Sequence, residues 1–354
     1  MGQILGMGLT HYPGLYMKDQ DASVFLRNTL SRGGLPERLK DPANWPEPMR
    51  REWSNDQGAA AAQEHRARGF AANRQLRKAL DDFDPDLVLV WGDDQYENFV
   101  EDIVPPFCCY ILDRIESRPY AFWEEKNKEF ERNIWGEGED TVFVHRGHSE
   151  AARYLVNRLS DEGLEVPYAY RLRYKRGLAH AFINTLLYLD CDRVGFDYPV
   201  IPFHVNCYGG EVIRRRGGMV EAAETSSEPD PGSPSARSCF DMGRAIAGVF
   251  KNSKYRVALV ASSSWSHAFL TRKNNWMYPD HESDRKRLAE LKDNRYALWG
   301  ELDRDTIDSA GHHEFLNWVC LAGAMAEIGG KAKVIDYVES YVLNSNKCYV
   351  MFPG

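Results

Sequence analysis

Short apolar runs of strand length alternate with segments of helical composition, and this alternation constrains the fold of the chain most strongly. Residues 59–83 are rich in Ala, Arg, Glu, Gln and Leu, which favour a helix, and Asp84-Pro85-Asp86 ends that pattern. Residues 87–91 then read Leu-Val-Leu-Val-Trp, a continuous apolar run that is typical of a strand buried on both faces. A long helix followed by a buried strand predicts an α/β fold.

The same alternation recurs along most of the chain. Apolar runs predict further strands at residues 3–10, 142–144, 199–205 and 257–261. Helical periodicity predicts helices at residues 150–159, 235–250 and 315–328. We therefore expect one large domain over residues 1–354, in which helices flank a central mixed sheet. The Pro-containing segment 33–57 is interpreted as a loop or as an excursion of the chain over the surface. The Gly-, Ser-, Pro- and Arg-rich segment 209–234 is interpreted as a mobile loop.

Composition excludes several classes of protein. The 354 residues are 43% hydrophobic and carry a net charge of −8, so the chain has enough apolar residues for a core and lacks the basic surface that nucleic-acid binding requires. No apolar run approaches the roughly 20 residues that cross a bilayer. Seven cysteines without a CxxC pair indicate reduced thiols and a cytoplasmic protein.

Polar side chains able to take part in catalysis follow the predicted strands. They are His11, the Asp93-Asp94-Gln95 group, His204 with Asn206, and His267, and a further cluster, residues 311–314, precedes the last apolar helix. Ligands gather at the carboxyl ends of strands in open α/β sheets, so these residues are candidates for a site. Each also has a structural interpretation as a strand cap, a turn former or a helix-start residue.

Known signatures of other chemistries are absent from the sequence. There is no GxGxxG after the first predicted strand and no GxxxxGK[ST], so nothing indicates a phosphate-binding loop. The sequence also lacks the GxSxG nucleophile elbow and the HExxH zinc motif.

Several motifs together resemble those of the type III (LigB-like) extradiol ring-cleavage dioxygenases, the family of the protocatechuate 4,5-dioxygenase catalytic subunit. The resemblance follows the order of the chain and rests on residues 8–15, 89–107, 201–206, 237–245, 263–269 and 310–318. It implies that His11 and Glu314 bind iron, that His267 is the acid/base residue, and that His180 is a second histidine of the pocket.

The third iron ligand is where this chain departs from the family. The family has Asp-His at the position where this sequence has Asp94-Gln95, and no histidine lies between His65 and His145. Gln95 is the expected third ligand by position, and an amide oxygen would be a weaker donor than imidazole. The alternatives are that His145, His148 or His204 replaces it, or that the metal is lost.

The resemblance implies a non-haem Fe(II) enzyme that uses O₂ to cleave a catechol-like or aminophenol-like ring. Two alternatives stay open: a metal-dependent enzyme of other chemistry, or a non-catalytic binding protein on the same fold. Four further residues are expected to contact substrate or to orient the ligands: Asp94, His204, Asn206 and His313. The expected partner is a small aromatic substrate, without nucleic acid or membrane, and self-association into a homo-oligomer is left open. We expect His11, Gln95 and Glu314 to converge in one pocket.

Overall fold

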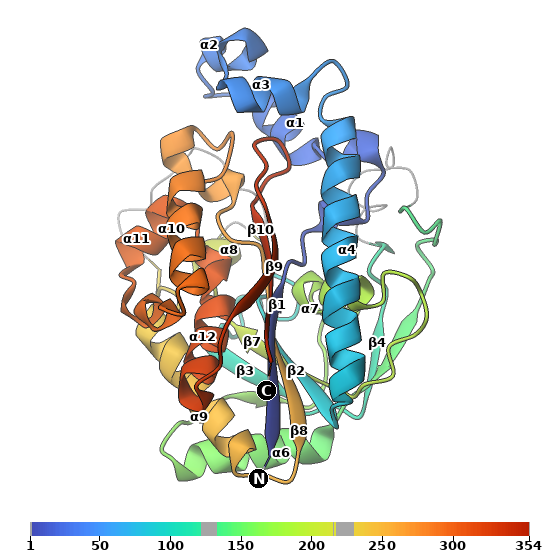
Figure 1. The fold of residues 1–354 in the computed structure, drawn as a ribbon, viewed down its shortest axis with the longest axis vertical. Coiled ribbons are helices and arrows are strands. Elements are labelled where there is room, and N and C mark those ends of the chain that lie inside the picture. Colours follow the sequence, from blue (N-terminus) through green and yellow to red (C-terminus); the bar gives the residue numbers. More distant parts are fainter. Residues whose placement is uncertain (1, 122–132, 215, 217–229, 354) are drawn as a thin grey trace.

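The computed structural model describes residues 2–121, 133–214, 216 and 230–353, and is built around an eight-stranded sheet (Figure 1). The strand order is β6-β3-β7-β2-β8-β1-β10-β9. The strands span β1 Gln3–Leu9, β2 Leu87–Gly92, β3 Phe107–Tyr110, β6 Tyr168–Ala169, β7 Val200–Val205, β8 Arg256–Ser262, β9 Lys333–Val338 and β10 Lys347–Phe352. A separate two-stranded sheet pairs β4 Arg114–Ser117 with β5 Phe143–Arg146.

The centre of the large sheet is parallel, which sets where a site can form. β7, β2, β8 and β1 are parallel neighbours, whereas β10 runs antiparallel to β1 and to β9, and β3 runs antiparallel to β7. The four parallel strands therefore end at one edge of the sheet, and the residues that follow them meet there.

Helices cover both faces of the sheet. In Figure 1, α4 (Ala59–Phe83) and α7 (His180–Leu189) lie on one side, and α9 (Ala236–Lys251) and α12 (Leu316–Ile328) lie on the other. Each face has its own core: Val88 and Val90 of β2 belong to the first, and Leu89 and Trp91 belong to the second. The remaining helices are α1 Val24–Ser31, α2 Glu37–Lys40, α3 Glu47–Trp53, α6 Ser149–Asp161, α8 Glu211–Arg214, α10 His281–Lys292 and α11 Arg304–Ala310.

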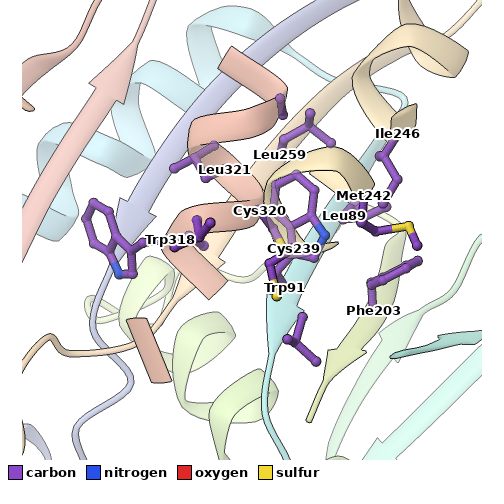
Figure 2. Packing of buried hydrophobic residues seen from close by; sticks show 14 of the residues in the cluster. Leu89, Trp91, Phe203, Cys239, Met242, Ile246, Leu259, Trp318, Cys320 and Leu321 are labelled. Carbon is purple, nitrogen blue, oxygen red and sulfur yellow. The ribbon is translucent and has the colours of Figure 1, made fainter. Parts of the chain in front are cut away.

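Close packing between α9 and α12 fixes the helix that follows Glu314. A Cβ at Gly243 would lie 1.8 Å from the carbonyl oxygen of Cys320, so only glycine allows the two backbones to approach this closely. Figure 2 shows Cys239 and Met242 of α9 and Cys320 of α12 beside Trp91 of β2. The start of α12 is therefore held firmly against the end of the sheet.

The predicted α/β architecture with a central mixed sheet is confirmed. Helix α4 occupies the predicted residues 59–83, and the strands expected at 3–10, 87–91, 199–205 and 257–261 are β1, β2, β7 and β8. The expected run at 142–144 became β5, which belongs to the small sheet rather than the central one. The helix expected at 150–159 is α6.

Of the two interpretations of residues 33–57, the loop was wrong. This segment contains α2 and α3, and Pro36 and Pro46 stand at their N-caps. Proline before or in the first turn of a helix costs no backbone hydrogen bond, so here it begins helices rather than ending them. Of the loop expected at 209–234, residues 215 and 217–229 lie outside the described residues, and residues 211–214 form α8. None of the described helices is both long enough and apolar enough to cross a membrane.

Candidate active site

The candidate site lies at the carboxyl ends of β1, β2 and β8. His11 follows β1, Gln95 follows β2, His267 follows β8, and Glu314 lies in a single helical turn, residues 313–315, directly before α12. Hydrogen bonds connect these segments: Ser263 Oγ donates to the Glu314 carbonyl at 2.9 Å, and Trp318 Nε1 donates to the Ser263 carbonyl at 3.0 Å. The sheet edge thus brings together residues that are far apart in the sequence.

His11, His267 and Glu314 meet at one carboxylate oxygen. Glu314 Oε2 is 3.2 Å from His11 Nε2 and 3.3 Å from His267 Nε2, and all three side chains are at least 95% buried. His11 Nδ1 lies 3.1 Å from the Ser262 carbonyl, and His267 Nδ1 lies 2.9 Å from the Trp265 carbonyl. A carbonyl can only accept a hydrogen bond, so Nδ1 of each ring carries a proton, and Nε2 of each ring faces Glu314.

This arrangement of two imidazole nitrogens and a carboxylate oxygen fits a cation. Glu314 Oε2 is buried and has no hydrogen-bond donor among the described residues, although two imidazole nitrogens face it. Two imidazoles and a carboxylate are the donor set that binds non-haem Fe(II) while leaving positions open. A divalent metal bound to His11 Nε2 and Glu314 Oε2 would satisfy these two atoms and would leave His267 Nε2 beside it.

The electrostatics of this group follow from burial. Burial lowers the pKa of His267 to about 4, so its imidazole is neutral at physiological pH. Burial alone would raise the pKa of Glu314, but its interactions with His267, His11 and Tyr208 outweigh burial and hold that pKa well below its usual range. The carboxylate of Glu314 is therefore ionised.

Gln95 and Tyr208 bind the other oxygen of Glu314. Tyr208 Oη donates to Glu314 Oε1, while Gln95 Nε2 donates to Glu314 Oε1 at 3.2 Å and to Tyr208 Oη at 2.6 Å. Gln95 therefore lies beside Glu314. However, its amide nitrogen, rather than the expected amide oxygen, faces the carboxylate, because a carboxylate accepts hydrogen bonds and an amide oxygen cannot donate one. In this geometry Gln95 orients Glu314.

His180 lies on the open side of the site. Its ring is 5.0 Å from that of His11, and Glu97 accepts hydrogen bonds from both the backbone N–H and Nδ1 of His180, at 2.9 and 3.0 Å. Burial would lower the pKa of His180, but the charge and hydrogen bond of Glu97 raise it to about 10. His180 is therefore a cation at neutral pH, and its side chain is 29% exposed.

Asp93 is a further carboxylate at this edge of the sheet. One carboxylate oxygen of Asp93, one ring nitrogen of His11 and one ring nitrogen of His180 all lie within 4.8 Å of one another. Asn317 Nδ2 donates to Asp93 Oδ1 at 3.3 Å, and Asp93 Oδ2 has no partner among the described residues. Burial, with Glu314 nearby, raises the pKa of Asp93 to about 7.

The structure places the other expected residues around this cluster rather than within it. Asp94 accepts hydrogen bonds from the backbone N–H groups of residues 97, 98 and 99, so it stabilises the turn that follows Gln95. His313 stacks on Tyr208 with a centroid distance of 5.8 Å. The ring of His204 packs on Phe99 at 4.5 Å, and the backbone N–H of Asn206 donates to the Pro106 carbonyl at 2.9 Å.

The three alternative ligands for the missing histidine do not join the cluster. His145 lies on β5 with its ring 6.2 Å from that of Phe196, and His148 Nδ1 accepts from the Ala151 N–H at the start of α6. Neither these two nor His204 forms a contact with Glu314 among the described residues. None of the three therefore takes the place of the missing histidine beside Glu314.

Sequence reasoning did not select Tyr208 or Glu97. It listed Asp93, which directly follows β2, among the candidates but gave it no role of its own. Tyr208 follows β7 by three residues and carries no motif of its own. Glu97 has no such signal, because its role depends on contact with His180, 83 residues further along the chain.

Comparison with known proteins found one family match and several similar proteins. Residues 230–350 match the family described as the catalytic LigB subunit of aromatic ring-opening dioxygenase, as the sequence motifs predicted. Two relatives named 2,3-dihydroxyphenylpropionate/2,3-dihydroxicinnamic acid 1,2-dioxygenase are similar over most of the chain. The protein from Paraburkholderia phymatum is 26% identical over 292 residues, which is 75% of this chain and 83% of that protein. The protein from Burkholderia vietnamiensis is 25% identical over 289 residues, with the same two shares. A relative of the same name from Photorhabdus laumondii is 24% identical over 55% of this chain and 47% of its own length.

Proposed function

This chain carries a LigB-family domain of the aromatic ring-opening dioxygenases, and on that premise we propose that it is a non-haem Fe(II)-dependent, extradiol-type dioxygenase. The proposed reaction cleaves a catechol-like or aminophenol-like ring next to a hydroxyl-bearing carbon and adds both atoms of O₂ to the opened product. The names of the relatives place a 3-substituted catechol first among the substrates to test.

The observation that carries this proposal is the convergence of His11 Nε2, His267 Nε2 and Glu314 Oε2, with no hydrogen-bond donor directed at that oxygen. His11 and Glu314 are proposed as fixed protein ligands of the iron. Bound there, Fe(II) would supply the transfer of electrons between the ring and O₂ that an unassisted reaction lacks.

His267 is proposed to move the proton of a ring hydroxyl. Its Nδ1–H is held by the Trp265 carbonyl at 2.9 Å, so Nε2 is the free base that can take up that proton. The backbone N–H of His267 donates to the Gly311 carbonyl at 3.0 Å, which fixes the residue against the loop that carries Glu314. A Cβ at Gly311 (φ +67°) would come within 2.8 Å of the His267 carbonyl oxygen, so glycine permits this contact.

His180 is proposed to bind the anionic form of the substrate. Glu97 keeps it protonated and orients its ring, and its partial exposure leaves it accessible from solvent. A cation beside the ring oxygens would favour their ionised form and would hold the substrate against His11 and His267.

A single domain and a cytoplasmic location remain part of this proposal. All seven cysteines are buried free thiols, which supports a reducing compartment. The partner that we propose is a small aromatic molecule.

The test is anaerobic loading with Fe(II), followed by exposure to O₂ with a panel of 2,3-dihydroxyphenylpropionate, catechol, protocatechuate and 2-aminophenol. We expect equal consumption of O₂ and one ring substrate, with a yellow product that absorbs in the near ultraviolet or visible range. Protein without iron is the control. Bound iron without O₂ uptake or product across the panel would refute the proposal.

One observation favours a second candidate, a non-catalytic binding protein. Gln95 replaces the histidine that the resemblance expects as a ligand, and its amide hydrogen-bonds Glu314 instead. The same experiment separates the two functions, because a binding protein would fail to retain iron in the anaerobic titration.

A further inference from the structure

Gln95 leaves one ligand position unfilled, and the structure offers a side chain for it. The Gln95 amide nitrogen is bonded to both Tyr208 and Glu314, so its contacts hold it beside the carboxylate rather than in the position of a ligand. The replacement must be a buried donor atom that lies near His11 and lacks a partner of its own.

Asp93 meets this description. Its side chain is fully buried, it has a ligand atom within 4.8 Å of one from His11, and Oδ2 has no hydrogen-bond partner among the described residues. Its other oxygen receives one long hydrogen bond, 3.3 Å from Asn317 Nδ2. The same Asn317 amide lies 3.3 Å from the Ser262 carbonyl that His11 Nδ1 contacts, so one residue orients both side chains.

The neighbouring Asp94 shows how unusual it is for a buried carboxylate oxygen to have no hydrogen-bond partner. Both of its oxygens are occupied by backbone N–H groups, at 2.8 Å for residues 97 and 98. Two adjacent, buried carboxyl groups thus differ in their contacts. Asp94 is satisfied by the turn, whereas Asp93 has one oxygen without a partner among the described residues.

Charge gives an independent reason for a cation here. Asp93 and Glu314 are 0% and 1% exposed, and no Lys or Arg of the described residues forms an ion pair with either. The His180 charge is balanced by Glu97. Burying two carboxylates without a cation is costly, and a bound divalent ion would neutralise both.

We propose that Asp93 is a protein ligand of the iron, so that His11, Asp93 and Glu314 hold the ion in this chain. This inference rests on the proposed function. His180 belongs to the same group of close donor atoms, but its Nδ1 is bound to Glu97 and its side chain is partly exposed, which leaves it for the substrate. Two carboxylates and one imidazole form a more oxygen-rich set than two imidazoles and one carboxylate, and such a set also suits Mn²⁺.

Mn²⁺ titration of the purified full chain tests the assignment without relying on turnover. Free Mn²⁺ gives a sharp electron paramagnetic resonance signal, and its loss on binding measures affinity. We expect Asp93→Asn to weaken Mn²⁺ binding at least about 100-fold, since outer contacts alone change metal affinity by about 10–100-fold. In an anaerobic Fe(II) titration, Asp93→Asn should likewise bind the metal more weakly than the parent.

Asp94→Asn is the matched control, because it removes the same charge one residue away. We expect Asp94→Asn to lower the melting temperature through its turn while metal affinity stays within about threefold of the parent. Asp93→Asn binding Mn²⁺ and Fe(II) as tightly as the parent would overturn the inference, even if the parent cleaves rings. A parent that binds metal through Asp93 but cleaves no ring would instead refute the proposed function alone. If Asp93→Asn does not fold, a crystal of the parent soaked in Mn²⁺ decides, and an ion that does not touch Asp93 overturns the inference.

Discussion

Asp284 connects the two loops that carry His267 and Glu314, and its removal should weaken the fold and the site together. The Asp284 side chain is fully buried. Its carboxylate lies 2.5 Å from His312 Nε2, accepts from Asn346 Nδ2 at 2.6 Å, and accepts from the Ser266 backbone N–H at 3.2 Å. Ser266 adjoins His267, and His312 stands two residues before Glu314.

The size of the effect of Asp284→Asn can be worked out from these contacts. The new amide keeps one acceptor oxygen and places an N–H₂ group against donors, so at least one buried partner is left unpaired. Leaving a buried hydrogen-bonding group without its partner costs about 1–3 kcal/mol. Unfolding entropy of about 2.1 cal/mol/K per residue gives about 0.74 kcal/mol/K for 354 residues, so the melting temperature should fall by about 1–4 °C.

Differential scanning calorimetry of the parent and Asp284→Asn measures this change. The control is Asp82→Asn, which removes the same charge from a side chain that is 64% exposed and paired only with Lys78 on one helix. Exposed pairs of this kind contribute about 0.3–0.5 kcal/mol, so the control should shift the melting temperature by less than about 1 °C. Equal melting temperatures for Asp284→Asn and the parent would refute the idea that this carboxylate joins the loops.

Three further predictions concern the site. Tyr208→Phe removes the hydroxyl that donates to Glu314 and accepts from Gln95, and should weaken anaerobic Fe(II) binding about 10-fold; unchanged affinity would show that the hydroxyl does not orient Glu314. His267→Phe should retain iron but lower turnover by about 10²–10⁴-fold in an O₂-uptake assay, and full activity would remove His267 from the mechanism. Glu97 raises the pKa of His180 from 6.5 to about 10, so the stability that this pair contributes is fully present below about pH 6.5 and is lost as pH rises through about 10. Glu97→Gln should abolish this alkaline loss in melting temperatures measured from pH 6 to 11, and an identical profile in parent and variant would contradict the assignment.

Local sequence signals predicted those elements whose structure is decided locally. Helix α4 matched its predicted bounds because its composition is strongly helical and Asp84-Pro85 follows it, and β2 matched because its continuous apolar run is buried on both faces. Strand β10 was not predicted, because Lys347–Phe352 becomes a strand by pairing with β1, more than 300 residues earlier. The placement of β5 in a second sheet also depends on its partner β4 rather than on its own residues.

The site residues also divide into those that local sequence signals can select and those whose role depends on distant contacts. His11, His267 and Glu314 could be selected because each stands at the end of a strand or the start of a helix, where α/β folds gather ligands. The role of Gln95 could not be predicted, because the direction of its amide is set by Tyr208, 113 residues away in the sequence. The contrast between Asp93 and Asp94 likewise appears only when the backbone N–H groups of the turn are placed.

The edge of the sheet between His11 and Glu314 is the proposed iron site. Anaerobic soaking of crystals in Fe(II), with diffraction data collected on both sides of the iron absorption edge, tests it most directly. We predict one strong anomalous peak in contact with both His11 Nε2 and the Glu314 carboxylate. Well-diffracting crystals without iron at this position, or with iron bound only elsewhere, would contradict it.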